Sequence, residues 1–256
     1  MNAAATARPV TGVVVALADE ARPLSARLRR SRLKAGDLIA VDDHLLLALS
    51  GIGPERAARA AENLLAAGVV AIASWGTAGG LDPKLPRAAL VLPKRVIDGN
   101  GNSYAVDVPW RWRLEQALNG VVRVASGPLL SSAQPLANVA QKAEAFARTS
   151  AIAVDMESAA VASCAADAHC PFMAVRTIAD TAAEQLPAAA LAAVDADGHL
   201  HWLRLLLALL RQPGDLPRLI ALGRHFAAAQ ATLEATSRQA PGLLAINDMT
   251  GFDGKQ

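Results

Sequence analysis

The stretch GVVVAL at Gly12–Leu17 is a short β-branched run that predicts a buried first strand. A segment with helical spacing follows at Asp19–Leu33, and strand and helix patterns continue to alternate along most of the chain. Further strands are expected at Leu38–Val41, Leu45–Leu49, Val69–Ser74, Ala88–Ile97, Val121–Ala125, Ala151–Val154 and Pro171–Ile178. Further helices are expected at Pro54–Ala67, Trp110–Leu118, Leu136–Arg148, Leu200–Leu210 and Leu216–Ser237, with an alanine-rich helix ending near Ala168. This order predicts an α/β fold with a mixed, largely parallel sheet and a helical C-terminal third.

The composition excludes several classes of protein. Of 256 residues, 53% are hydrophobic and only 4% are aromatic, so a large core of Ala, Val, Leu and Ile is expected and global disorder is excluded. The net charge of +2 gives no reason to expect a nucleic-acid partner. Two cysteines, Cys164 and Cys170, are too few for a disulfide framework or a structural zinc site, which favours a reducing compartment.

No linker of low-complexity composition divides the chain. We therefore expect a flexible N-terminus at 1–9, one domain at 10–240 and a loop-like tail at 241–256. Residues 1–9 lack the apolar stretch of a signal peptide. The uncharged run at Asn63–Leu81 is long enough to span a bilayer, but its glycines favour a helix, a stop and a buried strand. A cytoplasmic protein is expected.

Residues suited to chemistry follow four of the expected strands, and ligands gather at the carboxyl ends of strands in α/β sheets. The four segments are Leu17–Arg22, Ser74–Gly80, Val154–Ser158 and Val175–Asp180. Taken singly, a glycine-rich segment is usually a turn, and a carboxylate that opens a helix is usually a cap. Their joint order is far more specific than any one of them.

That order resembles the nucleoside phosphorylase superfamily, and especially its branch of methylthioadenosine/S-adenosylhomocysteine nucleosidases. The segments that carry the resemblance are Ser50-Gly51-Ile52-Gly53, Gly76-Thr77-Ala78-Gly79-Gly80, Asp155-Met156-Glu157 and Val175-Arg176-Thr177-Ile178-Ala179-Asp180. The resemblance covers about residues 10–180 and implies a three-layer α/β/α fold. It also implies an enzyme that cleaves the N-ribosyl bond of a nucleoside.

The resemblance implies a role for five side chains. Asp180 matches the general acid directed at purine N7, which requires a desolvated carboxyl with a raised pKa. Glu157 matches the residue that grips the ribose hydroxyls, with Met156 packed on the sugar. Glu20 matches the carboxylate that activates water, and Arg176 matches an arginine near the nucleophile. The alternatives are helix caps for Asp180 and Glu157, a solvated acid for Glu20 and a structural ion pair for Arg176.

The nucleophile site departs from the phosphate-using members. Thr77, with Gly76 in a glycine-rich turn, could hold water or phosphate. Phosphate-using hexameric members have arginines where this chain has Ser74 and Glu20, which disfavours phosphate, although Arg22 lies close to Glu20 in sequence. Water or phosphate therefore stays open as the nucleophile.

The loop expected to bind the base, Ser126–Ser131, departs from the family pattern as well. Nucleosidases stack an aromatic ring on adenine, whereas here Leu130 would replace that ring and the Ser131 backbone would meet the base edge. The family's serine before the general acid is Ala179, so the carboxyl of Asp180 needs another donor to orient it.

The segment from Ala182 to Arg224 resembles one subgroup, the hopanoid-associated phosphorylases. That resemblance implies release of adenine from adenosylhopane, in hopanoid biosynthesis. A lipid substituent requires an open apolar mouth, which we expect from the region Asp98–Trp112, with Tyr104, Trp110 and Trp112, and from the C-terminal helices. The alternative is that both tryptophans pack the core or a dimer contact. Transient contact with the surface of the inner membrane and a homodimer are expected.

Two enzymatic alternatives remain, a phosphate-dependent purine nucleoside phosphorylase and a methylthioadenosine/S-adenosylhomocysteine nucleosidase. A catalytically silent nucleoside-binding or storage protein is the alternative from another class. The expected ligand is a small-molecule adenine nucleoside that is linked to a lipid, with no metal and no organic cofactor, and with phosphate as a potential co-substrate. His199 and His201 have the spacing of metal ligands on a strand, but no third ligand accompanies them.

Overall fold

The computed structural model describes residues 10–24, 33–187, 190 and 213–239. Its strands are β1 (Thr11–Val15), β2 (Leu38–Ala40), β3 (Leu45–Leu49), β4 (Ala71–Gly80), β5 (Leu90–Val91), β6 (Arg95–Ile97), β7 (Ser103–Ala105), β8 (Val124–Ala125), β9 (Pro128–Ser131), β10 (Ala153–Asp155) and β11 (Phe172–Asp180). Its helices are α1 (Ala18–Ala21), α2 (Pro54–Ala66), α3 (Val108–Ala117), α4 (Val139–Thr149), α5 (Ser158–Asp167) and α8 (Leu216–Gln239), with short 3₁₀ turns at Arg22–Leu24 and Pro213–Asp215.

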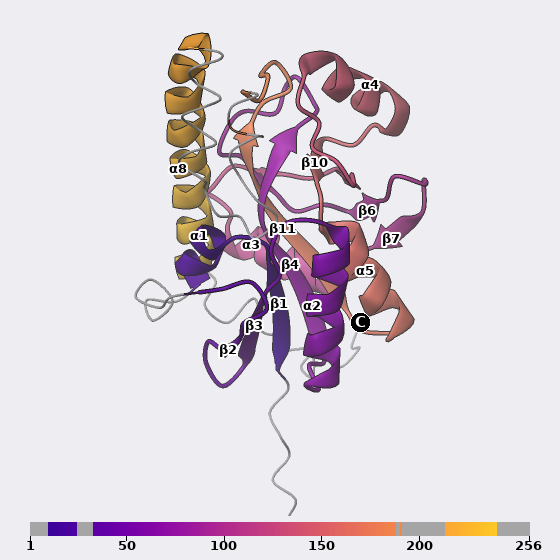
Figure 1. Ribbon diagram of the computed structural model, residues 1–256. Coiled ribbons are helices and arrows are strands. Elements are labelled where there is room, and N and C mark those ends of the chain that lie inside the picture. The colour runs from indigo at the N-terminus through magenta and orange to yellow at the C-terminus, as the bar shows by residue number, and fades with distance from the viewer. Residues whose placement is uncertain (1–9, 25–32, 188–189, 191–212, 240–256) are drawn as a thin grey trace, which may run out of the picture.

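The long strand β4 lies at the centre of the sheet (Figure 1). Its first half pairs in parallel with β1, its last two residues pair with β10, and β11 runs parallel to it along its other edge. Parallel pairs also join β1 to β3, β9 to β10, β6 to β9 and β5 to β8, while β2, β5 and β7 add antiparallel pairs. The expected mixed, largely parallel sheet is confirmed.

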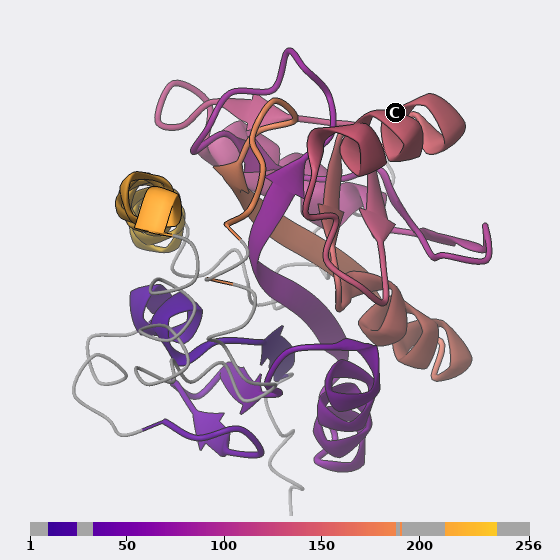
Figure 2. The same cartoon turned by 45° about the horizontal axis from the view of Figure 1, so that its top comes forward.

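Helices cover both faces of this sheet. On one face, α2 and α5 pack against each other and over a core cluster that includes Val14, Ile72 and Ala174. On the other face, α3, α8 and α1 cover a second cluster that includes Val15, Trp75 and Val175. Figure 2 shows α8 on the side of the sheet opposite α2 and α5. Alternate side chains of one strand thus point into two different cores. The fold therefore has three layers, with helices on both faces of the sheet.

The sequence of α2 explains its place in the fold. Pro54 begins the helix, where its missing N–H costs nothing, and Gly53 before it has a φ of 108° that suits glycine. The buried side chains Ala57, Ala60, Ala61 and Leu64 follow at helical spacing and form one apolar stripe. This stripe fixes α2 on the sheet with its N-terminus directed at the carboxyl ends of β1 and β3.

Several expected boundaries change for physical reasons. The predicted glycine-rich turn at 76–80 is wrong, because β11 pairs with this segment and extends β4 to Gly80. The single strand expected at 88–97 is two strands, β5 and β6, with Pro93 between them, since proline lacks the N–H that a ladder needs. The expected helix at 19–33 is only α1 and a 3₁₀ turn within the described residues, and Pro23 lies where it would have continued.

Some expectations lie outside the described residues. They are the flexible N-terminus at 1–9, the helix at 200–210, His199 and His201, and the tail at 241–256. The uncharged run from Asn63 to Leu81 is the end of α2 followed by β4, as expected. None of the helices in the described part of the chain is both long and apolar enough to cross a bilayer.

Candidate active site

A cavity of about 210 Å³ opens over β4 and β11, where β1 and β10 end. Four chain segments that are far apart in sequence converge on it, and each is one of the strand ends singled out above. Its lining includes Glu20, Thr77, Met156, Glu157, Arg176 and Asp180, together with Asp155. The apolar part of the lining includes Leu17, Ile52, Pro135, Leu136 and Leu186. The sequence-predicted catalytic residues therefore share one site.

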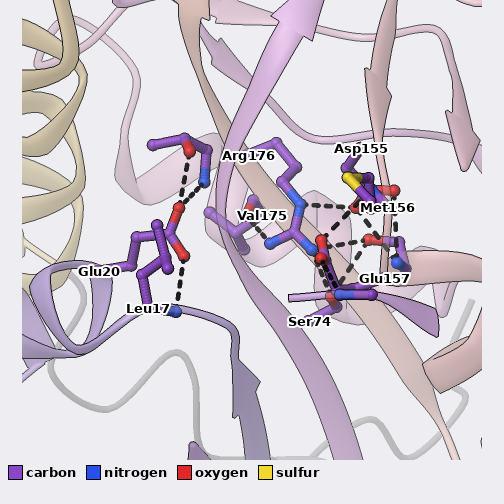
Figure 3. Close-up of polar contacts among 11 residues, drawn as sticks. Leu17, Glu20, Ser74, Asp155, Met156, Glu157, Val175 and Arg176 are labelled. Carbon is purple, nitrogen blue, oxygen red and sulfur yellow. Dashed lines mark hydrogen bonds and ion pairs between the residues drawn. The ribbon is translucent and has the colours of Figure 1, made fainter. Parts of the chain in front are cut away.

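Glu20 is buried and held by three hydrogen bonds (Figure 3). Its Oε1 accepts from the Thr77 backbone N–H at 2.8 Å and from the Thr77 hydroxyl at 2.6 Å, and its Oε2 accepts from the Leu17 N–H at 3.3 Å. Burial raises the pKa of Glu20, and the bonds from Thr77 and the charge of Arg176 oppose that rise. Thr77 therefore orients Glu20, and the carboxylate is a base held at the wall of the cavity.

Arg176 is buried near Glu20, and most of its N–H groups donate hydrogen bonds to other protein groups. Its Nε donates to Asp155 Oδ2 at 2.7 Å, and one terminal nitrogen donates to the hydroxyls of Ser74 at 2.7 Å and Ser158 at 3.1 Å. Its other terminal nitrogen donates to the Val175 carbonyl at 3.4 Å. Burial opposes the guanidinium charge, but the surrounding carboxylates outweigh it and raise the pKa of Arg176. Four of its five N–H donors are thus used within the protein.

Glu157 stands at the start of α5, close to the start of α2. Its Oε1 accepts from the Gly53 N–H at 3.0 Å, and its Oε2 accepts from the Met156 N–H at 3.3 Å. Burial and the charge of Asp155 raise the pKa of Glu157 to about 7, despite the opposing charge of Arg176. The Ser-Gly-Ile-Gly segment therefore presents a backbone donor, from the positive end of a helix, to the carboxylate.

The cavity carries an excess of negative charge. Glu20, Asp155 and Glu157 face a single guanidinium, that of Arg176, and all four side chains are buried. Asp155 forms an ion pair with Arg176. Because that guanidinium is already paired, Glu20 and Glu157 have no direct ion pair in the described site. An environment of this kind stabilises a developing positive charge and disfavours an anion.

Asp180 ends β11 and faces the same cavity. Its Oδ2 is in direct contact with the Lys142 ammonium of α4. Burial raises the pKa of Asp180, while Lys142 opposes the rise through its charge and its hydrogen bond. Gly79 lies beside the carboxylate, since a Cβ there would sit 3.2 Å from Oδ2. Asp180 is therefore a carboxyl group that can carry a proton at the cavity.

Some predicted ligand contacts are not brought to the cavity. Leu130 is buried in a cluster under α4, and Ser131 pairs with Asp155 in the sheet, because the expected base loop is the strand β9. The residues after β9 that do line the cavity are Gln134, Pro135 and Leu136. Gly76 lies outside the lining but allows close approach, because a Cβ at Gly76 would sit 2.8 Å from Glu20 Oε2.

The aromatic mouth expected from 98–112 is not formed by those residues. Trp110 is fully buried in the core under α3, and Trp112 points to solvent with 52% of its surface exposed. Tyr104 packs against the core cluster beneath α2 and α5 and lines a different cavity. Of the three side chains, Trp110 is the one used in packing α3, and the lining of the candidate cavity contains none of them.

Sequence reasoning missed several site residues. The sequence assigns no functional role to Asp155. In the structure it binds Arg176, and it accepts a hydrogen bond from the Ser158 N–H at the start of α5, at 3.2 Å. Ser74 and Ser158 were missed as partners of Arg176, because hydroxyls in a strand and a helix carry no motif of their own. No sequence pattern points to Lys142. The one indirect sign was Ala179, which has no hydroxyl and so left Asp180 in need of another donor.

A family model described as "Phosphorylase superfamily" matches residues 11–211. The chain belongs to the phosphorylase superfamily. The expectation of an enzyme of the kind that cleaves N-glycosyl bonds is thereby confirmed, and the subgroup within the superfamily stays a prediction. No curated protein matches this member of the superfamily in sequence.

Solved structures share the fold of this phosphorylase-superfamily protein. The 5'-methylthioadenosine/S-adenosyl homocysteine nucleosidase of Helicobacter pylori has a TM-score of 0.67 at 15% identity, covering 93% of this chain and 98% of its own. The corresponding nucleosidase of Neisseria meningitidis, in complex with methylthio-immucillin-A, gives 0.66 at 19% identity, with coverages of 90% and 97%. Futalosine hydrolase of H. pylori gives 0.66 at 16% identity, with coverages of 92% and 97%.

The raised pKa of Glu157 predicts that the charged form of this side chain lowers the stability of the fold. The folded state holds this proton up to about pH 7, against an ordinary value of 4.5, so stability is lost as pH rises through that window. Glu157→Gln keeps an oxygen for the Gly53 N–H and removes the charge. Chemical denaturation should show the variant more stable than the parent at pH 8, by on the order of 2–3 kcal/mol, and equally stable at pH 4.

Glu62→Gln, an identical change on the exposed face of α2, is the matched control and should leave the pH dependence unaltered. A Glu157→Gln variant less stable than the parent at pH 8 would contradict the assignment of a buried carboxylate whose charge destabilises the fold.

Proposed function

We propose that this protein hydrolyses the N-ribosyl bond of an adenine nucleoside, with water as the nucleophile. The observation that carries the proposal is the charge arrangement of one cavity. A protonatable carboxyl, Asp180, shares it with two buried carboxylates, Glu20 and Glu157, while the nearby guanidinium is already paired with Asp155. Cleavage of an N-ribosyl bond needs an acid for the base, negative charge for the sugar and a base for the water.

The leaving group is the first requirement. Adenine leaves poorly as an anion, and protonation at N7 lets the electrons of the C1′–N9 bond move onto a neutral base. Asp180 supplies that proton, because burial keeps its pKa raised and its carboxyl faces the cavity.

The sugar is the second requirement. As the bond to adenine lengthens, the ribose becomes an oxocarbenium-like cation that nearby negative charge stabilises. Glu157 supplies this charge and accepts hydrogen bonds from the ribose hydroxyls, with Met156 packed on the sugar. Since the pKa of Glu157 is about 7, activity should fall as the pH drops below neutrality and the carboxylate is protonated.

Glu20 completes the reaction by taking a proton from the attacking water. The water oxygen bonds to C1′ as the C1′–N9 bond breaks, so the products are adenine and a sugar with a free anomeric hydroxyl. Asp180 loses one proton and Glu20 gains one, and exchange with solvent restores both. The hydrogen bonds from Thr77 fix the orientation of Glu20 before the substrate arrives.

Water is favoured over phosphate by the same geometry. A phosphate anion would meet Glu20 and Glu157 with one arginine nearby, and most donors of that arginine are committed to Asp155, Ser74 and Ser158. Arg22 offers no substitute, because its side chain is half exposed and pairs with Asp19. Bringing a dianion to such a site is unfavourable.

The substrate we propose is adenosylhopane, giving adenine and a ribosyl hopane in hopanoid biosynthesis. This finer assignment rests on the resemblance of residues 182–224 to one subgroup, of which 188–189 and 191–212 lie outside the described residues. The solved relatives act on methylthioadenosine and S-adenosylhomocysteine, or are named futalosine hydrolase, so a small adenine nucleoside is the second candidate. A cytoplasmic homodimer that contacts the membrane transiently is part of the same proposal, and sedimentation with and without vesicles tests it.

Asp180→Asn should lower kcat by about a hundredfold or more, because an amide retains the shape of the carboxyl but cannot donate its proton to N7. Steady-state measurement of adenine release checks this result. Asp43→Asn, the same change in an exposed turn, is the matched control. Activity of Asp180→Asn within a few-fold of the parent would refute the acid assignment.

Adenine release should be independent of phosphate and should require the Glu20 carboxylate. Chromatography of the products with and without phosphate is expected to give the free sugar hydroxyl in both cases. Glu20→Gln should lose about a hundredfold in kcat, because the amide cannot accept the water proton. A sugar 1-phosphate as the main product would show that phosphate, not water, is the nucleophile.

A substrate panel tests the finer assignment. Adenosylhopane in detergent micelles, methylthioadenosine and adenosine are compared by kcat/KM for adenine release. We expect adenosylhopane to be preferred by at least about tenfold, since remote binding energy raises kcat/KM. Preference for methylthioadenosine, with no release from adenosylhopane, would assign the protein to small nucleosides.

A further inference from the structure

Lys142 is a buried lysine that the proposed mechanism does not use. It lies on α4, and its residue has no exposed surface. Its ammonium contacts Asp180 Oδ2 and donates to the carbonyl oxygens of Thr181 and Glu184, each at 2.8 Å. An ammonium has three N–H donors, so the three acceptors satisfy it completely.

Such a lysine is costly to bury. Removing an ammonium from water is unfavourable by several kcal/mol unless a counter-charge is in contact with it. Two of the acceptors of Lys142 are neutral carbonyls, so Asp180 provides the only negative partner that touches it in the described structure. The other lysines in the described part of the chain, Lys34, Lys84 and Lys94, are exposed.

The same contact is the one that Asp180 needs. Within the described residues, Lys142 is the one group that donates a hydrogen bond to the Asp180 carboxyl. The residue before it, Ala179, has no hydroxyl to contribute. Because the ammonium binds Oδ2, the carboxyl is fixed in rotation, and Oδ1 has no donor from the described residues competing with a ligand.

Lys142 also fixes the chain that follows β11. Its bonds to the Thr181 and Glu184 carbonyls hold the turn that begins at Asp180. Arg87 binds the Glu184 side chain from the other side, at 2.6 Å and 3.0 Å. The segment that follows Asp180 is therefore held from two sides, by Lys142 of α4 and by Arg87.

Other charges face Asp180 and must be weighed. Glu184 raises the pKa of Asp180 and His225 of α8 lowers it, but both are weaker causes than Lys142. Arg218 of α8 lines the cavity behind Asp180 with them. Burial would raise the pKa of Glu184, yet Arg87 and Thr181 hold it at about 2, so its charge is constant at neutral pH. Glu20, Glu157, Asp155 and Arg176 face the acid across the active-site cavity.

We propose that Lys142 is a positioning residue that aims the carboxyl of Asp180 and, through its charge, sets the pH at which Asp180 gives up its proton. This inference rests on the proposed function, in which Asp180 donates a proton to the base. The ammonium compensates for the missing hydroxyl at position 179. Without its charge, burial alone would hold the proton on Asp180 to a higher pH and make it a weaker acid.

The test is the pH profile of kcat for adenine release in Lys142→Met. The variant removes the charge but keeps a long apolar stem in the buried site. We expect kcat at neutral pH to fall by about tenfold or more, because the carboxyl is no longer aimed. The alkaline limb, where Asp180 loses its proton, should move to higher pH by about one unit or more.

Three further variants complete the experiment. Lys142→Arg keeps the charge and should leave the alkaline limb in place, whatever its effect on rate. Lys94→Met, the same change at an exposed position, should match the parent in both rate and profile. Lys142→Gln, also neutral, is measured in the same way if Lys142→Met does not fold.

The outcomes separate the two proposals. An alkaline limb that stays in place in a folded, neutral variant at 142 would overturn the inference, since a merely structural lysine would change rate or stability only. Unchanged kcat in that variant would overturn it as well. If Asp180→Asn keeps its activity, the proposed function itself fails, and the profile of the Lys142 variants no longer reports on the acid.

Discussion

The buried guanidinium of Arg176 is the constraint on which the rest of the site depends. It sits in the middle of the longest strand pair, β4 and β11, and binds one residue from each of β4, β10 and α5. A charge in this position is tolerable only with a paired carboxylate and satisfied donors. Asp155 provides the pairing, and that leaves Glu20 and Glu157 as carboxylates free of a direct ion pair in the described site. The negative character of the cavity follows from this one partnership.

The fold brings each group of the proposed mechanism to the same cavity from a different element. Glu20 follows β1 and is held by Thr77 of β4, while Glu157 begins α5 and meets the N-terminus of α2 at Gly53. Asp180 ends β11 and is reached by Lys142 from α4. All of these elements must therefore pack correctly before the groups can act together, and the sheet holds them around one cavity where β1 and β10 end.

The sequence predicts the fold through local signals, because β-branched runs mark the buried strands. Carboxylates after strand ends single out Glu20, Glu157 and Asp180, but the roles assigned to them come only from the resemblance to a known family. The extent of β4 could not be predicted, because pairing with β11 overrides the turn preference of Gly76 and Gly79. Leu130 was assigned to a loop for the same reason, since partners in β10 and β6 turn its segment into a strand. Lys142 carries no pattern in sequence, because its partner lies 38 residues away.

The proposed mechanism requires Asp180 to protonate N7 of an adenine nucleoside. It is tested most directly by comparing adenosine with 7-deazaadenosine, which has carbon in place of N7 and cannot accept that proton. Release of the free base is followed by chromatography for both nucleosides at the same enzyme concentration. If protonation at N7 is required, adenine is released from adenosine and no base is measurably released from 7-deazaadenosine, which should still bind as a competitive inhibitor. Release of 7-deazaadenine at a rate close to that of adenine would contradict it.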